Sequence, residues 1–283
     1  MNPKSKKKLK KGIGSAASVI LMILLTVIVL FPIYWLVVTS FKMESEIYQI
    51  PPSLFPKNLT FDNYLHALVE TKLPQYFLNS IIYTVGTLLV ALLCGALAAY
   101  AMSRFRFKGK KTYLLVILLS QLMPMTTLIV PLYVSFGKMN LLNNRVAMII
   151  VYAAIQIPIA IWLLIGYFNG IPKEIDEAAI MDGCTRWQIL TKIVLPLAKP
   201  GLMAVGLSIA ISVWQELMLA MTFTNQDELR PLMAGVSAAI TKSGVQWGQI
   251  TATGVLALLP MLIVFIFCQK YLIQGLTGGA VKG

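Results

Sequence analysis

The sequence contains few charged residues, little histidine and little cysteine. Of its 283 residues only 12% are charged, one is histidine and three are cysteine. A water-soluble domain usually carries about 25% charged residues, so this chain has too little polar surface to cover a soluble globule. The cysteines are Cys94, Cys184 and Cys268, and the first and last of them lie inside apolar runs. This distribution predicts reduced thiols and no disulfide framework.

The residues needed for common enzyme sites are missing as well. His66 is the single histidine, so no His-Glu-x-x-His pair exists to bind a metal. A Gly-x-x-x-x-Gly-Lys-Ser/Thr phosphate loop is also absent, because the nearest fragment, at Gly109, lacks the first glycine and the hydroxyl. We therefore expect no catalytic residue, no metal and no cofactor in this chain.

Long apolar runs dominate what the sequence does contain. Hydrophobic residues make up 58% of the chain, and the mean hydropathy is +0.77. A bilayer core about 30 Å thick requires about 20 apolar residues per helix. The sequence therefore predicts an all-α, polytopic membrane protein with about six transmembrane helices. Their expected ranges are residues 15–38, 79–102, 112–136, 146–168, 200–223 and 249–272.

The first apolar run follows a basic segment, residues 1–14, that resembles the start of a signal peptide. The run is too long for a signal peptide, and no small-residue cleavage site follows it. We therefore interpret it as a retained membrane anchor. The rest of the predicted organisation is one membrane domain, residues 15–274, and a tail, residues 275–283.

The distribution of Lys and Arg predicts the orientation, because short cytoplasmic loops of membrane proteins retain positive charge. With the N-terminus inside, 17 of the 24 basic residues fall in cytoplasmic segments and seven fall outside. Both ends of the chain are then cytoplasmic. The net charge of +13 is explained by membrane lipids with anionic headgroups, because the basic residues flank apolar spans. We expect no nucleic acid partner.

The longest predicted cytoplasmic segment, residues 169–199, carries acidic as well as basic residues. Pro172 suits the first turn of a helix, and Glu174 and Asp176 follow near the positive end of that helix. Gly183 can end the helix by taking a left-handed conformation. The segment thus begins with a short helix that stops at a sharp bend.

A second short helix is predicted from about Thr185 to Pro196, where the proline ends it. Its spacing places Trp187, Leu190 and Val194 on one side. We name this pair of short helices within residues 169–199 the knob. A knob of this kind can enter a groove on a partner protein, or it can lie as an amphipathic loop on the lipid headgroups. The geometry alone leaves both alternatives open.

The letters of the knob resemble the EAA loop of bacterial ABC importer permeases. The match consists of Glu177-Ala-Ala179, three residues, Gly183, nine residues, and Ile193-Val-Leu-Pro196. In that family the loop couples the permease to a cytoplasmic ATPase subunit by docking into its cleft. The resemblance implies a type I ABC importer permease fold and an ATPase-docking site. The residues carried over to that site are Glu177, Ala178, Ala179, Asp182, Gly183, Leu195 and Pro196.

Further motifs resemble the carbohydrate branch of these permeases, in particular the smaller maltose-transporter permease. They are Ser40-Phe-Lys42, Pro51-Pro52, Phe55-Pro56, Thr60-Phe-Asp-Asn-Tyr64, Phe77-Leu-Asn-Ser80 and Ala99-Tyr-Ala-Met-Ser-Arg-Phe105. The tail Gly275-Leu-Thr-Gly-Gly-Ala-Val-Lys-Gly283 is similar to the C-terminal signature of the family. That likeness implies a contact of Gly278 and Lys282 with the ATPase. Read without the resemblance, a glycine-rich tail is a frayed chain end.

The fifth span carries the candidate residues of a substrate pathway. Ser208, Ser212, Gln215 and Glu216 are predicted to share one helical face. An acid deep in a span costs about 2.5–3.5 kcal/mol on insertion scales, so Glu216 should face protein or water. Carboxylate and amide oxygens can bind sugar hydroxyls, and Trp214 can stack on a sugar face. The alternatives are that Glu216 pairs with a neighbouring subunit and that the serines serve close packing.

The third span is predicted to be interrupted. It contains Gln121, Pro124, Thr126, Thr127 and Pro131, which favour a kink or a local unwinding of the helix. Breaks of this kind can permit gating, although ordinary proline kinks are common. We interpret the methionines between positions 121 and 125 as packing residues.

The resemblance therefore implies the membrane-spanning permease of a bacterial plasma-membrane importer for a sugar or oligosaccharide. Its implied partners are a second homologous permease, two ATPase subunits that bind ATP and Mg, and an extracytoplasmic solute-binding protein. One alternative is an ABC importer permease for an amino acid or polyamine, because the EAA pattern occurs in those systems as well. A second alternative, from another class, is a secondary transporter or channel.

Overall fold

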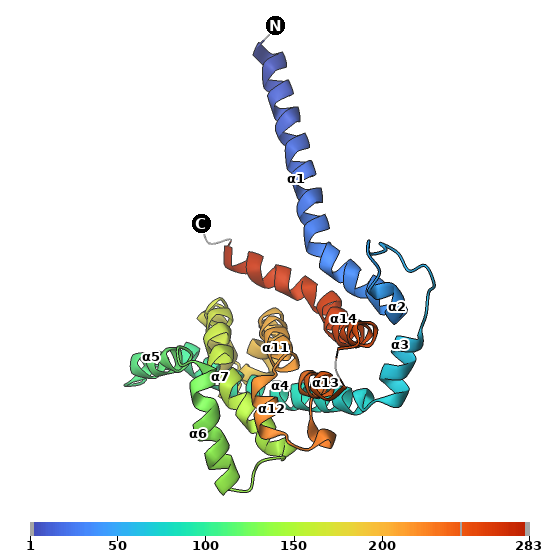
Figure 1. Cartoon of the computed structure of the whole chain (residues 1–283). Helices are drawn as coiled ribbons and strands as arrows, with labels where there is room; N and C mark the ends of the chain where they lie inside the picture. Colours follow the sequence, from blue (N-terminus) through green and yellow to red (C-terminus); the bar gives the residue numbers. More distant parts are fainter. Residues whose placement is uncertain (1–2, 244, 281–283) are drawn as a thin grey trace. The chain divides into compact units, whose positions relative to one another are not determined.

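The computed structural model describes residues 3–243 and 245–280. Within those ranges the elements are helices joined by loops, with no strand (Figure 1). By length and composition, four helical segments can cross a membrane, and two bent helix pairs raise the number to as many as six. The prediction of an all-α membrane protein is confirmed.

The first of two compact units comprises residues 1–71 and 243–256. It contains the long N-terminal helix, whose apolar part is Ser18–Ser40, and the beginning of the last helix. Apolar side chains of the N-terminal helix between positions 19 and 31 are about half exposed, which suits a lipid environment. The elements of this unit are α1 (Pro3–Ser40), α2 (Glu44–Ile47), α3 (Asp62–Leu65), the π-helix η1 (His66–Glu70) and the start of α14 (Trp247–Ala280).

The second unit comprises residues 72–242 and 257–283. Three of its helices, α4, α7 and α11, pack against one another around the main hydrophobic core. The elements are α4 (Leu73–Arg104), α5 (Lys110–Ser120), α6 (Met125–Lys138), α7 (Arg145–Asn169), α8 (Lys173–Met181), α9 (Arg186–Ile189), the π-helix η2 (Leu190–Val194), α10 (Leu195–Leu197), α11 (Lys199–Trp214), α12 (Met218–Phe223), the 3₁₀-helix η3 (Asp227–Leu229), α13 (Leu232–Ser243) and the rest of α14.

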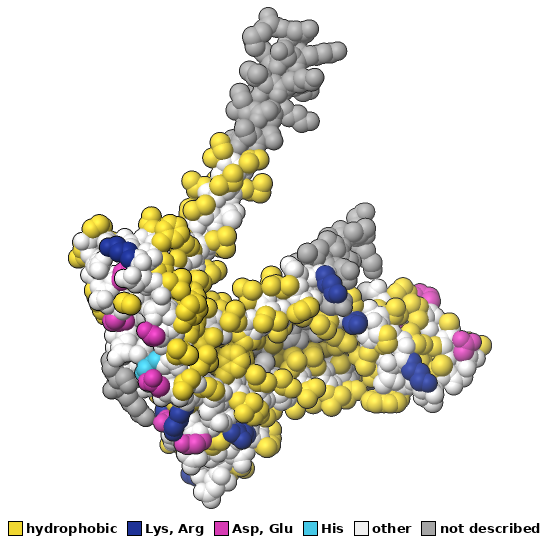
Figure 2. Space-filling model, turned by 90° about the vertical axis from the view of Figure 1, so that its right-hand side faces the viewer, with side chains coloured by type: hydrophobic (Ala, Val, Ile, Leu, Met, Phe, Trp, Pro, Cys, Tyr) yellow, Lys and Arg dark blue, Asp and Glu magenta, His cyan; other side chains and the backbone are white. Residues whose placement is uncertain are grey.

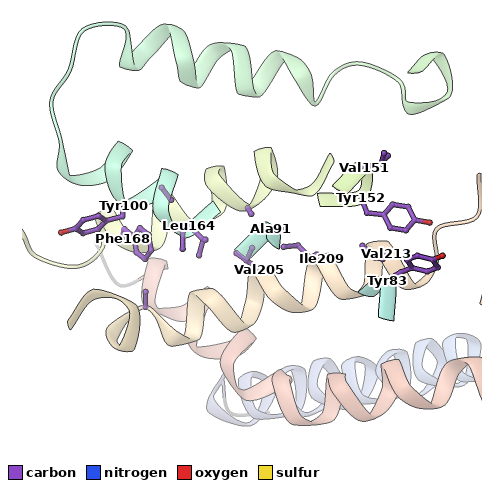
Figure 3. Packing of buried hydrophobic residues seen from close by; sticks show 14 of the residues in the cluster. Tyr83, Ala91, Tyr100, Val151, Tyr152, Leu164, Phe168, Val205, Ile209 and Val213 are labelled. Atoms are coloured by element: carbon purple, nitrogen blue, oxygen red, sulfur yellow. The ribbon is translucent and has the colours of Figure 1, made fainter. Parts of the chain in front are cut away.

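Small residues let these core helices approach closely. A Cβ added to Gly95 of α4 would lie 2.8 Å from the Cβ of Ala160 on α7, and one added to Gly201 of α11 would overlap the ring of Tyr167. Figure 3 shows side chains of this core, among them Ala91 and Val205. Close approach through small residues is the usual way in which membrane helices associate.

Two predicted spans are broken. The segment expected at residues 112–136 consists of α5 and α6, which are bent by 93° at a break of four residues or fewer. This confirms the predicted interruption near Pro124, which is the N-cap of α6. The segment expected at 200–223 is not one helix, because α11 ends at Trp214 and α12 begins at Met218. The prediction of a continuous fifth helix was wrong.

Hydrophobic side chains cover much of the surface shown in Figure 2. The exposed apolar residues include Leu89 and Leu93 on α4 and Phe267 on α14, which are 65%, 61% and 71% exposed. An apolar surface that is exposed in a single chain marks contact with lipid or with other subunits.

Candidate functional site

The first helix of the knob, α8, has the geometry that its sequence predicts. Pro172 is its N-cap, and Glu174 and Asp176 lie in its first turn. After α8, Gly183 has a φ of +81°, so the predicted left-handed conformation is confirmed. The bend is closed by main-chain hydrogen bonds of 3.0 Å from the Gly183 N–H to the Ile180 carbonyl and 2.9 Å from the Cys184 N–H to the Ala179 carbonyl.

The second helical segment of the knob begins at Thr185 with a capping box. The Gln188 N–H donates to the Thr185 hydroxyl at 3.3 Å, and the Thr185 N–H donates to the Gln188 side chain at 2.8 Å. The segment continues through α9, η2 and α10 to Leu197, past Pro196, and then meets α11 at an angle of 76°. Pro196 therefore lies at the start of α10 and does not end the helical segment.

The knob's apolar side also differs from the prediction. Leu190 and Val194 are buried, whereas Trp187 is 61% exposed. Leu190 and Val194 belong to the π-helix η2 and share a buried side, whereas Trp187 precedes η2 in α9 and lies outside that buried side.

The residues expected to dock the ATPase divide into an outer and an inner group. Ala179 is only 6% exposed and belongs to the core that contains Phe168 and Ile189. Its small side chain therefore fits the interior of this chain and is not presented to a partner. Leu195 is half-buried. The outer group, whose members are exposed, consists of Glu177, Ala178, Asp182, Gly183 and Pro196.

A buried ion pair holds α8 against the end of α4. The Arg104 Nε and Asp176 Oδ2 atoms are 2.9 Å apart, and the two side chains are 3% and 5% exposed. Arg104 also donates to the Ile171 carbonyl at 3.2 Å. Sequence reasoning missed this pair. The available signals were an arginine at the end of a span and an acid in residues 169–199, the segment that the charge distribution predicts to be cytoplasmic.

The break in the fifth predicted span is built around Glu216. Its Oε1 atom accepts from the Leu219 N–H at 2.8 Å, and its Oε2 atom accepts from the Ala220 N–H at 3.1 Å. The Tyr152 hydroxyl donates to Oε2 at 2.8 Å. The carboxylate thus satisfies main-chain donors at the start of α12, which would otherwise lack partners within the helix.

The other predicted pathway residues, Trp214, Ser212 and Gln215, differ in burial and in the contacts that they make. Trp214 is buried, because its Nε1 donates to the Ala257 carbonyl at 3.2 Å and its ring meets Phe77 edge-on at 5.4 Å between centroids. The side chain is thus covered by residues of this chain, and its stacking on a sugar stays a prediction. Ser212 donates to the carbonyl of Ser208 within α11 at 2.9 Å. Gln215 lies beyond α11 and is exposed, so the predicted common helical face does not form.

A cavity of about 630 Å³ lies beside the break between α5 and α6. Its lining combines Gln121, Met123 and Met125 from the break with Ile155 and Pro158 from α7. Met125 packs against the hydrophobic core, as the sequence predicts, whereas Met123 is 55% exposed.

The motif Phe77-Leu-Asn-Ser80 anchors a loop to the beginning of α4. Asn79 is fully buried, and its Nδ2 donates to the carbonyls of Glu228 and Arg230 at 2.8 and 3.0 Å. Its Oδ1 accepts from Arg145 at 3.0 Å. The Ser80 hydroxyl accepts from the Leu232 N–H at 2.8 Å. The polar residues of this motif therefore fix the loop between α12 and α13.

The motif Ser40-Phe-Lys42 has a comparable role in the first unit. Lys42 is 2% exposed, donates to the Ser53 carbonyl, and lies 4.7 Å from the centre of the Trp35 ring. Asn63 donates to the carbonyls of Ser40 and Lys42 at 3.0 and 2.9 Å. Later residues of the loop after α1 thus bind to the Ser40-Phe-Lys42 motif at the beginning of that loop.

A carboxylate is buried within the same loop. Glu46 accepts from the Ser53 hydroxyl at 2.6 Å and from the Lys57 N–H at 2.9 Å. These hydrogen bonds, the serine's first, hold the pKa of Glu46 below its ordinary value of 4.5. A second acid, Glu44, accepts from the N–H groups of Trp247 and Gly248 at the start of α14, both at 3.1 Å.

The described part of the chain contains no group of three or more His, Cys, Asp or Glu residues that would hold a metal ion. In the predicted tail, Gly278 lies within α14, and Lys282 lies outside the described residues.

Comparison with known proteins agrees with this architecture. Residues 91–278 match the family described as binding-protein-dependent transport system inner membrane component. The chain belongs to this family of membrane-embedded transport components.

Among its relatives is the diacetylchitobiose uptake system permease protein of Streptomyces coelicolor, which is 33% identical over 89% of this chain and 92% of the relative. The trehalose/maltose transport system permease protein of Thermococcus litoralis is 34% identical over 92% of this chain and 94% of the relative. A chain in the crystal structure of a bacterial ABC transporter that imports the acidic polysaccharide alginate is 26% identical. The similarity to that chain has a TM-score of 0.83 and covers 93% of this chain and 97% of the other.

Proposed function

We propose that the chain is the membrane-spanning permease subunit of an ATP-driven importer for a sugar or oligosaccharide. The observation that carries this proposal is the similarity, over nine-tenths of the chain, to permeases whose names specify diacetylchitobiose and trehalose or maltose. The structural likeness to a chain of an alginate importer supports the same class of substrate. The chain itself is not an enzyme in this proposal, and ATP and Mg bind to partner ATPase subunits.

The knob is the proposed contact with the ATPase. Its exposed residues Glu177 and Ala178 lie in α8, and the exposed Asp182 follows in the turn that ends this helix. Gly183 allows the left-handed conformation of that turn, and the hydrogen bonds from the Gly183 and Cys184 N–H groups close it. A preformed turn lowers the cost of binding in a groove. ATP-driven closure of two ATPase copies would then displace the knob and change the access of the pathway.

The proposed partners in the membrane and outside it are a second homologous permease and a solute-binding protein. One chain in a crystal structure of a bacterial alginate ABC transporter in complex with a periplasmic protein has the same fold as this chain, with a TM-score of 0.67 at 16% identity. Gln215 and Glu216 remain candidate pathway residues, because they lie at the break where the membrane helix is interrupted. Interrupted helices with freed polar groups are common at substrate sites of transporters.

The proposed orientation places both chain ends and the knob in the cytoplasm. Cysteines introduced at Asn58 and Lys173, in a background without the native cysteines, should react with impermeant reagents from opposite sides of the membrane. Both positions are exposed in the structure. Reaction of both from the same side would contradict the orientation.

The transport proposal is tested by reconstituting the chain with the second permease, the ATPase and the binding protein in vesicles. Maltose, trehalose and diacetylchitobiose are offered as labelled substrates, with an amino acid and a polyamine as comparisons. ATP-dependent accumulation of at least one sugar is expected. Accumulation of the amino acid or polyamine alone would identify the other importer class, and accumulation without ATP would identify a secondary transporter.

A further inference from the structure

The end of α4 contacts the cytoplasmic segment that contains the knob at several points. The Arg104–Asp176 ion pair joins it to α8. The Ser103 hydroxyl donates to the Asn169 side chain at 2.7 Å, at the point where α7 ends. Beyond α4, the ring of Phe105 lies 5.7 Å from the Arg186 guanidinium carbon, at the start of α9. The end of α4 and the residue after it therefore contact the beginning, the first helix and the second helix of this segment.

The ion pair differs from the other contacts because both of its charges are removed from water. Separating a buried pair leaves two uncompensated charges in a poorly solvated site, which is strongly unfavourable. Asp176 is also favoured where it lies, since the first turn of a helix attracts negative charge. If α8 moves while water stays excluded from this site, Arg104 must therefore move together with Asp176.

Arg104 is the last residue of α4, a helix of 32 residues. This helix packs along α7 and α11 through the main core. Helices α7 and α11 are already joined to the knob through the chain, whereas 67 positions separate Arg104, at the end of α4, from Ile171 before the knob. A side-chain link is therefore the direct route by which α4 can follow the knob.

We infer that Arg104 and Asp176 are positioning residues that transmit movement of the knob to α4, and this inference rests on the proposed docking of the ATPase at the knob. The alternative is a pair that only stabilises the fold. Removal of both charges distinguishes the two roles. The double neutral variant, Arg104→Met with Asp176→Asn, leaves no unpaired charge. If the pair only stabilises the fold, this variant should function normally, because a neutral replacement of a buried pair is often tolerated.

The experiment uses the complete reconstituted complex and two fluorescent reporters, each an environment-sensitive label on a single cysteine. Lys173→Cys, at the start of α8, reports on the knob, and Phe107→Cys reports on the chain just beyond α4. Both positions are exposed. Cys94, Cys184 and Cys268 are replaced by alanine. The signal is the fluorescence change on adding ATP and vanadate, which requires no transported sugar.

In the complex with the native Arg104–Asp176 pair, both reporters should respond. In the double neutral variant the knob reporter should keep its response, while the Phe107→Cys response should fall at least threefold, with normal amounts of co-purified ATPase. A charge exchange, Arg104→Asp with Asp176→Arg, should recover part of that response. Glu174→Gln, which changes an exposed carboxylate of the same helix, is the matched control and should leave both responses unchanged.

Full responses of both reporters in the double neutral variant would overturn the inference and leave the docking proposal standing. A knob reporter that stays silent in the native pair, although the ATPase is bound, would instead contradict docking at the knob. Loss of assembled complex in the double neutral variant, with recovery in the charge exchange, would show a role in folding alone and would also overturn the inference.

Discussion

The Nδ2 atom of Asn79 donates a hydrogen bond of 2.8 Å to the carbonyl oxygen of Glu228, 149 positions further along the chain. The same side chain also binds the Arg230 carbonyl and accepts from Arg145. To make these contacts, the side chain must supply two N–H donors and one acceptor oxygen. Among residues of this size, the asparagine amide supplies all three.

We therefore expect Asn79→Leu, which keeps the volume, to release the loop between α12 and α13. Each buried carbonyl or guanidinium left without its partner costs about 1–3 kcal/mol. Limited proteolysis of the purified chain should show faster cleavage between residues 224 and 231. Gln75→Leu removes only longer contacts of the same network, 3.3 Å to the Asn79 side chain and 3.4 Å to the Glu228 carbonyl, and should increase cleavage less. Equal protection of the loop in Asn79→Leu and the native chain would contradict this assignment.

Glu216 is predicted to stabilise the break in the fifth span through its three hydrogen bonds. Glu216→Ala removes all of them and leaves two main-chain N–H groups exposed to an apolar environment, at about 1–3 kcal/mol each. Thermal unfolding of the detergent-solubilised chain should shift to lower temperature. Tyr152→Phe removes one hydrogen bond and should cause a smaller shift.

Uptake measurements then separate the cap from a substrate role. The amide of Glu216→Gln retains one acceptor oxygen, so the unfolding temperature should change little. If Glu216 also contacts the sugar, uptake by this variant should nevertheless fall clearly below that of the native chain. Normal uptake by Glu216→Gln would exclude it from the pathway. The result for the family and for the knob would not change.

The bend at Gly183 is predicted to be required for ATPase association. Gly183→Val forces a β-branched residue into a left-handed conformation, whereas Gly183→Asn places there a residue that tolerates it. Co-purification of the ATPase should fall about tenfold or more for the valine variant if the strain exceeds about 1.4 kcal/mol. The asparagine variant should retain most of it. Equal association of both variants with the ATPase would show that the bend is not part of the contact.

A pair of alanines provides a second test of the knob. Ala178 is exposed, so Ala178→Asp should weaken ATPase association while the chain remains folded. Ala179 is buried, so Ala179→Asp should instead destabilise the knob, because an unpaired charge would enter the core. Proteolysis of the isolated chain distinguishes the two effects. Loss of the fold in Ala178→Asp would contradict its assignment to the outer surface.

The loop after α1 should depend on pH through Glu46. The pKa of its carboxyl group is lower in the folded loop than in the unfolded chain, because the Ser53 hydroxyl and the Lys57 N–H bind the charged form. This contribution to stability is complete above the ordinary value of 4.5 and is lost as the pH falls through the lower, folded pKa.

The measurement is the proteolytic protection of residues 43–60 between pH 7 and pH 3, with an acid-active protease at the low end. Glu46→Gln should be less protected than the native chain at pH 7, and the difference should shrink as the pH falls below 4.5. Glu70→Gln, an acid whose side chain is 68% exposed, serves as the control. A difference that grew as the pH fell would contradict the direction of the pKa shift.

Features set by neighbouring residues were predictable from the sequence. Pro172 and Gly183 marked the ends of α8, because proline and glycine restrict or release the backbone locally. Pro124 similarly marked the break before α6. The apolar runs predicted the membrane helices, because span length follows from the thickness of the bilayer.

Features set by contacts between distant residues were not predictable. Arg104 and Asp176, or Asn79 and Glu228, meet only after the helices pack. The same holds for the orientation of Ala179 and the burial of Trp214, since each depends on which neighbour covers it. The break at Glu216 was missed because apolar residues flank Gln215 and Glu216 on both sides, and hydropathy does not detect a main-chain interruption within such a run.

The contact between Tyr167 and Gly201 has a consequence for the divergence of related sequences. The aromatic ring occupies the space that a side chain on residue 201 would need. A larger residue at 201 is therefore compatible with this packing only when residue 167 becomes smaller in the same lineage. Substitutions at these two positions should accordingly be acquired in pairs, so that their covariation among homologues records the crossing of α7 and α11.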